Sequence, residues 1–240
     1  MSAASPAWLQ ALGSHLAAHG LDRLGVADGA PHGAVLAGCR SVVVVGNGGR
    51  ALWEGLLAAV RAEPALAEAP HPLDAYVARV LAEAPVPVPG RWVACAAESP
   101  VPLDFRTLGL HAGLGWPSRL GLLLHPEAGP WLGLRAAFFT PVALAPTGPL
   151  PGGGPCPTCP APCMPACPIG AVGPEGVDWR ASWAFRQRDD RCHGGCLARE
   201  ACPEGRDHAY GAAQHRYHQH PPSRAALLIS EAARAPDRPS

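Results

Sequence analysis

Seven of the nine cysteines lie close together in the second half of the chain, between residues 156 and 202. Thiolates at such short spacings are ligands of iron–sulfur clusters and of zinc. A secreted disulfide scaffold would instead spread its cysteines through a short chain, so we expect metal ligation here. The two remaining cysteines, Cys39 and Cys95, stand alone and are expected to be small buried side chains.

The first four of these cysteines have nearly the spacing of the bacterial ferredoxin run, in which two-residue gaps precede a three-residue gap and a Cys-Pro pair. One extra residue lengthens the second gap, at Pro160-Ala-Pro162. Such a loop can wrap three corners of a [4Fe–4S] cluster, while the cysteine before proline serves a second cluster.

Cys202-Pro203 repeats the Cys-Pro ending, as the second half of a two-cluster ferredoxin does. We therefore assign a first cysteine set to one cluster: Cys156, Cys159, Cys163 and Cys202. A second cysteine set would hold the other cluster with only three thiolates: Cys167, Cys192 and Cys196. The alternative interpretation is a zinc site.

The residues before the cysteines predict an α/β (or α+β) domain. Apolar residues at helical spacing predict helices at 6–19, 51–62, 72–83 and 103–112, and apolar runs predict strands at 24–27, 41–45, 92–97, 119–124 and 132–139. The sequence Gly46-Asn47-Gly48-Gly49 is interpreted as the turn that ends the second strand.

A shift to Pro, Gly and Thr at 141–155 indicates a boundary near residue 150. We expect an α/β domain at 1–150 with a cofactor or substrate pocket, a ferredoxin-like cysteine module at 151–222, and a C-terminal helix and tail at 223–240. His215, His218 and His220 lie about one helical turn apart, which suits a polar surface better than a metal site.

The charge and hydropathy of the chain limit its partners. The 19 Lys and Arg residues balance the 19 Asp and Glu residues, so no surface for nucleic acid is expected. Apolar runs fall short of the roughly 18–20 residues of a membrane span, and the first residues lack a basic and apolar leader. We expect a soluble cytoplasmic protein.

Beyond the cysteines, two segments carry a family resemblance. They are Gly113-Leu-Gly115-Trp116 and His125-Pro126-Glu127-Ala-Gly129-Pro-Trp131. Together with the strand at 41–45 and the two Cys-Pro endings, they resemble epoxyqueuosine reductase, the cobalamin-dependent iron–sulfur enzyme of transfer-RNA queuosine synthesis. The chain is still more similar to the small stand-alone ferredoxin-like relatives of that enzyme.

The resemblance implies a cobalamin site and further site residues. The cofactor-binding candidates are Gly113, Leu114, Gly115, Trp116, Arg119 and His125. Glu98 and Asp104 are candidates for delivering a proton. Ser182 stands where the relatives place a cysteine ligand of the second cluster, and Pro117-Ser118-Arg119-Leu120 replaces their Ile-Gly-Lys-Asn, so both sites depart from the family pattern.

Two functional hypotheses follow. In the first, the protein is an oxidoreductase whose one or two [4Fe–4S] clusters pass electrons to a corrinoid or a small-molecule substrate in the α/β domain. This hypothesis requires an electron donor protein or reductase as partner. In the second, it is a ferredoxin-type electron-transfer protein that docks to another enzyme. A domain of about 150 residues favours the first, since a carrier needs no ligand pocket.

Overall fold

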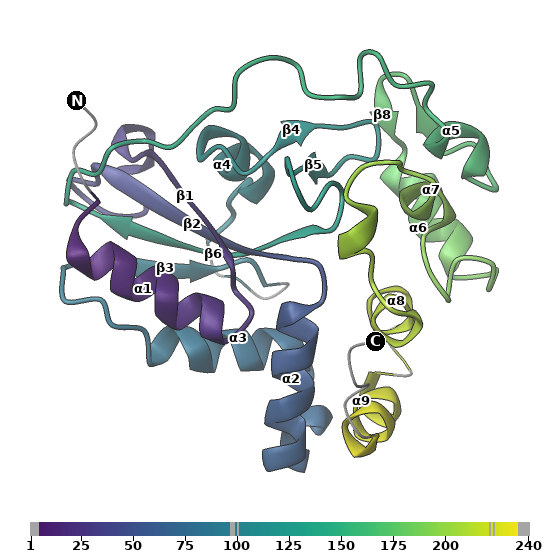
Figure 1. Ribbon diagram of the computed structural model, residues 1–240, viewed down its shortest axis with the longest axis horizontal. Helices are drawn as coiled ribbons and strands as arrows, with labels where there is room; N and C mark the ends of the chain where they lie inside the picture. The colour runs from purple at the N-terminus through teal and green to yellow at the C-terminus, as the bar shows by residue number, and fades with distance from the viewer. Residues whose placement is uncertain (1–4, 97–98, 100, 221, 223, 235–240) are drawn as a thin grey trace.

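A four-stranded antiparallel sheet lies at the centre of the first part of the chain (Figure 1). The computed structural model describes residues 5–96, 99, 101–220, 222 and 224–234. Across the sheet the strands are β1 (Arg23–Asp28), β2 (Ser41–Gly48), β6 (Leu132–Thr140) and β3 (Arg91–Ala94). Every neighbouring pair is antiparallel, so the fold is a mixed α/β fold of the α+β kind.

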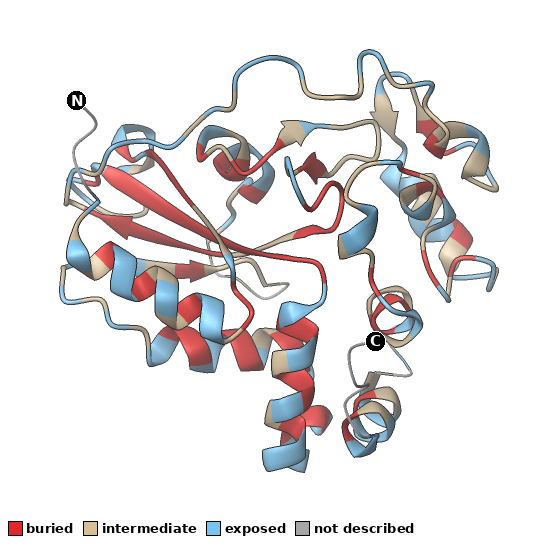
Figure 2. Cartoon of the chain, viewed as in Figure 1, coloured by how far each residue is buried: buried red, intermediate tan, exposed pale blue. Residues whose placement is uncertain are grey.

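The sheet is buried on both faces because helices cover both. On one face lie α1 (Ala7–Ala18), α2 (Ala51–Ala62) and α3 (Pro72–Ala82), and on the other lies α4 (Phe105–His111). Successive side chains of a strand point to opposite faces. Val43 and Val45 accordingly pack with α1–α3, while Val42 and Val44 pack on the side of α4. Figure 2 shows β2 as a continuous buried strand.

The chain returns to the first domain at its C-terminal end. After α8 (Ala212–Gln219), the amphipathic helix α9 (Arg224–Ala233) packs on α2 and places Leu228 and Ala232 in the core shared by α1–α3. Arg61 of α2 donates a hydrogen bond to the carbonyl oxygen of Ala232 at 2.8 Å. The C-terminal helix thus completes the hydrophobic core of the first part of the chain.

The cysteine module is built from short elements. They are α5 (Cys163–Ala166), the hairpin of β7 (Val172–Gly173) and β8 (Gly176–Val177), α6 (Trp179–Arg186) and α7 (Leu197–Glu200). Its hydrophobic cluster has three buried residues, Cys163, Val172 and Ala198, and six partly buried ones pack against them: Leu120, Ala161, Met164, Cys167, Val177 and Cys196. A core this small contributes little to the stability of the module.

Three strand predictions are wrong in detail. The strand predicted at 92–97 is β3, which ends at Ala94. The strand at 41–45 continues to Gly48 because a bulge between Val45 and Gly46 lets β2 stay paired with β6. Of residues 119–124, only β5 (Leu123–Leu124) is a strand, and it pairs with β4 (Trp116–Pro117) across a turn. The short 3-10 helices η1 (Ala30–His32), η2 (Pro64–Glu68) and η3 (Arg206–His208) were also not predicted. No helix in the described ranges is long and apolar enough to cross a membrane.

Candidate functional site

The structure brings the first cysteine set together around one cavity. Cys156, Cys159, Cys163 and Cys202 all line it, although Cys202 follows α7 and is far from the others in sequence. Two short helices bring these distant segments together. Helix α5 begins at Cys163 and packs against α7, which Cys202 follows. The four thiols that ferredoxin-like spacing assigns to one cluster therefore surround a common space.

Ionisation of the first cysteine set is unfavourable without a bound cation. Burial raises the pKa of the Cys163 thiol, and the neighbouring thiolates of Cys156 and Cys159 raise it further. Burial likewise raises the pKa of the Cys202 thiol, with Cys156 and Cys163 adding to the effect. A cationic metal group would reverse this balance and release protons as it binds.

The extra residue in the cysteine loop is accommodated by Ala161. This residue has a φ of 58°, the left-handed region that L-amino acids avoid. Its backbone N–H points at the Sγ atom of Cys159, at 3.4 Å. The strained residue Ala161 thus donates a backbone hydrogen bond to the sulfur of Cys159, a predicted cluster ligand.

Replacing Ala161 with glycine should stabilise the protein. The change removes a left-handed penalty of about 1–2 kcal/mol, partly offset by the entropy of glycine in the unfolded chain, which leaves a gain of about 0.5–1 kcal/mol. Urea unfolding measures it. Ala184→Gly, at an exposed position inside α6, is the control and should lose about 1 kcal/mol. Equal losses in both variants would contradict the strain.

The second cysteine set lies around another cavity, of about 300 Å³. Cys167, Cys192 and Cys196 line it, and Ser182 of α6 lines it too. Apolar side chains make up much of the remaining wall, among them Val172, Phe185 and Leu197. The structure therefore places the serine hydroxyl on the same cavity as the three thiols.

The thiols of each cysteine set line a cavity and do not converge on one point in the described residues. A single zinc ion needs ligands within about 2.3 Å of one point. In the described part of the chain, no three His, Cys, Asp or Glu side chains converge in that way. The thiolates of a [4Fe–4S] cluster each bind a different iron, so they surround a space instead of meeting at one point. The donor set matches such a group at the first set, where four thiols line a cavity of about 20 Å³, and at the second, where three thiols and a hydroxyl line about 300 Å³.

A third cavity, of about 270 Å³, adjoins the first cysteine set. Trp116 and His125, two of the six candidate cofactor residues, line it. Leu124, Pro155 and Glu204 line both this cavity and the one at the first cysteine set. A ligand in the third cavity would therefore sit one side chain away from the thiols.

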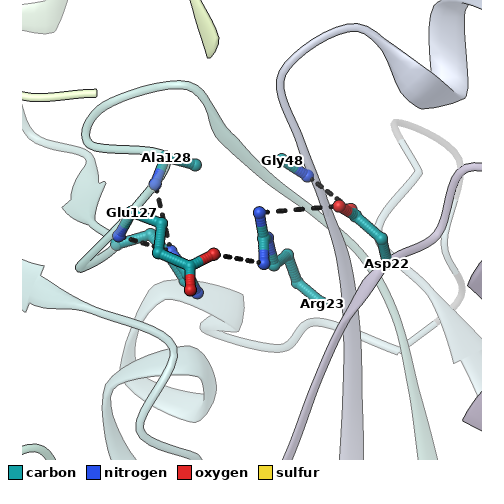
Figure 3. Close-up of polar contacts among 6 residues, drawn as sticks. Asp22, Arg23, Gly48, Glu127 and Ala128 are labelled. Carbon is teal, nitrogen blue, oxygen red and sulfur yellow. Dashed lines mark hydrogen bonds and ion pairs between the residues drawn. The ribbon is translucent and has the colours of Figure 1, made fainter. Parts of the chain in front are cut away.

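A chain of polar contacts fixes the turn that carries His125 (Figure 3). Its Nδ1 atom accepts hydrogen bonds from the backbone N–H groups of Glu127 and Ala128, at 3.1 and 3.2 Å. Glu127 pairs with Arg23 at 2.9 Å, and Arg23 lies 3.6 Å from Asp22, which accepts the N–H of Gly48 at the end of β2.

This arrangement sets the protonation of His125. Because Nδ1 is an acceptor, the proton of the neutral ring is on Nε2. Burial lowers the pKa of His125, and the charge of Arg23 lowers it further. The ring is therefore a neutral hydrogen-bond donor at neutral pH.

The other predicted site residues have varied surroundings. Arg119 lines the cavity of the first cysteine set and donates a 2.6 Å hydrogen bond to the carbonyl of Cys156. Leu114 is buried in the core on the α4 side of the sheet. Gly113 has a φ of 71°, and an added Cβ would lie 2.8 Å from the Thr147 carbonyl, so a close backbone approach requires glycine there. Gly115 likewise lies against the backbone of Leu124.

The two candidate acids have no demonstrated catalytic position. Asp104 caps α4, and its carboxylate accepts hydrogen bonds from the backbone N–H and the hydroxyl of Thr107 at 3.0 and 2.7 Å. These bonds lower the pKa of Asp104, which favours the ionised form over the protonated form that a general acid needs. Glu98 lies outside the described residues.

A further cavity, of about 530 Å³, was missed by the sequence analysis. It lies on another side of Cys202 and is lined by Trp131, Glu200, Arg206, Tyr210 and His215. The Arg199 guanidinium lies 4.5 Å from the ring centre of Trp131 and 4.6 Å from that of Tyr210. Trp131 and the histidines were visible in the sequence, but no spacing rule linked the two segments.

Comparisons with known proteins place this geometry in a structural context. No family model matches the chain, and no curated protein matches it. Epoxyqueuosine reductase from Bacillus subtilis is similar in structure, with a TM-score of 0.54 and 15% identity over 85% of this chain and 67% of that one. The C. elegans B12-trafficking protein CblC has a TM-score of 0.60 and 12% identity, with 96% and 97% of the two chains covered.

A catabolic reductive dehalogenase is also similar, with a TM-score of 0.55 and 18% identity over 94% of this chain and 35% of that one. This protein shares their fold. The chain spans about two thirds of the reductase and about a third of the dehalogenase. The fold relation implied by the sequence resemblance is confirmed.

The histidines of α8 pack with aromatic rings. His215 contacts Trp131 and Tyr210, and His218 contacts Tyr210 and Tyr217. Burial, together with the charges of Arg135, Arg199 and Arg224 and of His215, lowers the pKa of His218 to about 3. His218 is consequently neutral at physiological pH.

Acidification should destabilise the protein through His218. Between about pH 6.5 and 3 the unfolded chain binds a proton at this residue and the folded chain does not, so stability falls by up to about 1.4 kcal/mol per pH unit. Urea unfolding from pH 7 to pH 4 should therefore show a weaker pH dependence for His218→Gln than for the wild type. The exposed control His111→Gln should retain the wild-type dependence. An unchanged slope in His218→Gln would refute the assignment.

Proposed function

We propose that the protein is an iron–sulfur oxidoreductase. The first cysteine set holds one [4Fe–4S] cluster, and the second cysteine set holds another whose fourth corner faces Ser182. Bound to these thiolates, such clusters supply one-electron transfer. The electron acceptor is a corrinoid or a small substrate at the cavity lined by Trp116 and His125.

One observation carries this proposal. Each cysteine of a Cys-Pro pair lines a cavity together with cysteines from the other half of the module. Cys202 lines the cavity of Cys156, Cys159 and Cys163, and Cys167 lines the cavity of Cys192 and Cys196. This exchange is the ligation pattern of two-cluster ferredoxins. Neither a structural zinc site nor a set of buried unpaired cysteines would require it.

The surrounding residues support the chemistry. Arg119 brings a positive charge to the first cysteine set and, among the charges that act on Cys163, lowers the pKa of that thiol. Apolar side chains make up much of the wall around the second set, and a less polar surrounding tunes the potential of a bound cluster. His125 holds a proton on Nε2 beside the first set.

The corrinoid part of the proposal rests on the third cavity and on the fold. At about 270 Å³ the cavity is smaller than ordinary ligand pockets of roughly 300–1,000 Å³, so it suits only part of a large ligand. Two of the proteins that share this fold are described as a B12-trafficking protein and as an enzyme of B12-dependent dehalogenation. A corrinoid is the cofactor class that these similarities favour.

Titration of the reduced holoprotein with hydroxocobalamin tests the corrinoid site. We expect a change in the corrinoid spectrum and co-elution, both weakened about tenfold or more in Trp116→Ala, because loss of a buried aromatic contact costs more than 1 kcal/mol. The control Trp92→Ala alters a tryptophan that packs on Phe138 of the sheet. Absence of binding well above micromolar concentrations would instead support the electron-carrier hypothesis.

A further inference from the structure

Gly48, the last residue of β2, packs against the side chain of Arg23 on β1. A Cβ atom added at Gly48 would lie 2.6 Å from Nε of Arg23 and 3.2 Å from Cβ of Ala128. Any larger residue would displace the arginine or the turn that carries His125, so this close approach requires glycine. Part of the segment Gly46-Asn47-Gly48-Gly49, which the sequence predicts only as a turn, therefore makes room for Arg23.

Arg23 connects the ends of β1 and β2 with the turn that carries His125. Its guanidinium pairs with Glu127 at 2.9 Å and lies 3.6 Å from Asp22, whose carboxylate accepts the N–H of Gly48 at 2.8 Å (Figure 3). The Arg23 side chain is 16% exposed, and its Nε atom is buried without a hydrogen-bond partner among the described residues. A buried, unpaired donor costs free energy, which distinguishes this placement from an ordinary surface ion pair.

The ring of His125 has one engaged nitrogen and one available nitrogen. Two backbone N–H groups point at Nδ1, so a proton on Nδ1 would face two donors and no acceptor. The neutral ring therefore carries its proton on Nε2. No hydrogen bond to a described residue occupies Nε2, and His125 lines the third cavity. The Nε2–H group is thus available to a ligand in that cavity.

We infer that Arg23 is a positioning residue that fixes His125 as a hydrogen-bond donor to an acceptor atom of the ligand in the third cavity. Through Glu127, Arg23 holds the turn whose two N–H groups keep the proton of His125 on Nε2. This inference rests on the proposed function, because it assumes a ligand in the cavity. It adds the chemistry of one contact, since a carbonyl, carboxylate or phosphate oxygen can accept the Nε2–H bond and a donor group cannot.

Charged groups around His125 act on its protonation in both directions. Burial lowers the pKa of His125 most, the charge of Arg23 lowers it next, and the charge of Glu127 raises it. Loss of the Arg23 charge therefore raises this pKa, and loss of the Glu127 charge lowers it further. The other titratable groups around the ring are Asp22, which raises the pKa, His208, which lowers it, and Glu204, which lines the same cavity.

A purely structural ion pair between Arg23 and Glu127 is the alternative. The Glu127 side chain is 68% exposed, and exposed pairs contribute little to stability. Removing a pair that serves only structure would leave the tautomer and the pKa of His125 unchanged. The test therefore measures the protonation of His125 as well as stability.

The test compares four variants of the full-length holoprotein. Arg23→Gln removes the charge of the arginine, Glu127→Gln removes the charge of its partner, and Gly48→Ala displaces Arg23 without changing any charge. Arg40→Gln is the control, since Arg40 is exposed and precedes β2 at the end opposite to Gly48. Long-range proton–nitrogen NMR of protein with isotope-labelled histidine reports the tautomer and the pKa of His125, whose signals are assigned by their loss in His125→Gln. Urea unfolding and titration with hydroxocobalamin are recorded for each variant.

We expect a single tautomer of His125, with the proton on Nε2, in the wild type and in Arg40→Gln. Arg23→Gln and Gly48→Ala should both show exchange between the two tautomers. Arg23→Gln should also raise the pKa of His125, whereas Glu127→Gln should lower it. Hydroxocobalamin should bind about two- to tenfold more weakly to Arg23→Gln and Gly48→Ala, which corresponds to the loss of one hydrogen bond.

A single Nε2–H tautomer with an unchanged pKa in Arg23→Gln would overturn the inference and leave only a structural ion pair. Exchange between tautomers in the wild type would overturn it as well. A wild type that shows the expected tautomer but does not bind hydroxocobalamin would instead contradict the corrinoid part of the proposed function.

Discussion

Cys202→Ala should remove the iron of the first site as completely as Cys163→Ala, a loss of about four irons per chain. Both thiols are buried on the same cavity, although α6, α7 and the hairpin of β7 and β8 separate them in sequence. Removing either one leaves one iron of the proposed cluster without its thiolate. Iron and acid-labile sulfide measured per chain after anaerobic preparation report the result.

Cys39→Ala is the control for this experiment. Cys39 is buried beside the sheet and its thiol donates a hydrogen bond to the Ser41 carbonyl at 3.5 Å. This variant should keep its full iron content. If Cys202→Ala also kept it while Cys163→Ala did not, the exchange of Cys-Pro ligands between the two sets would be refuted.

Ser182→Cys should raise the iron content and the oxygen tolerance of the protein. Ser182 lines the cavity of Cys167, Cys192 and Cys196, so a thiol there would complete four ligands. An alcohol must lose its proton to bind iron and is a poor ligand beside thiolates, so the native corner is weak. Iron content before and after exposure to air measures both effects, with a gain of up to about four irons per chain.

Ser182→Ala is the counterpart of this variant and should change the iron content little. Loss of iron in Ser182→Ala without a gain in Ser182→Cys would show that the hydroxyl is a ligand. Unchanged iron of about four per chain in both would mean that the second set binds no cluster.

Local sequence patterns predicted the elements with strong periodicity. The helix expected at 51–62 is α2 (Ala51–Ala62), because its apolar positions at helical spacing are the ones that face the sheet. The patterns predicted too short a β2. They ended the strand at Val45, whereas the bulge after Val45 lets β2 continue its pairing with β6. Register and bulges are set by a partner strand, which a local pattern cannot contain.

The grouping of the cysteines was predictable because ligand spacing is itself a local geometric rule. The aromatic cavity beside Cys202 was not predictable in the same way. Trp131 precedes β6, whereas Tyr210 and His215 lie near and in α8, and only the packing of α8 against the sheet end brings them together. The cation–π contacts of Arg199 with Trp131 and Tyr210 arise from that packing, and no periodic pattern in the sequence indicates them.

The most direct test of the central claim is the metal content of protein purified without oxygen. The account predicts brown protein with about four to eight irons per chain, an equal amount of acid-labile sulfide, and little zinc. Colourless protein with stoichiometric zinc and no sulfide would contradict it, because the cysteine sets would then serve a structural metal instead of electron transfer.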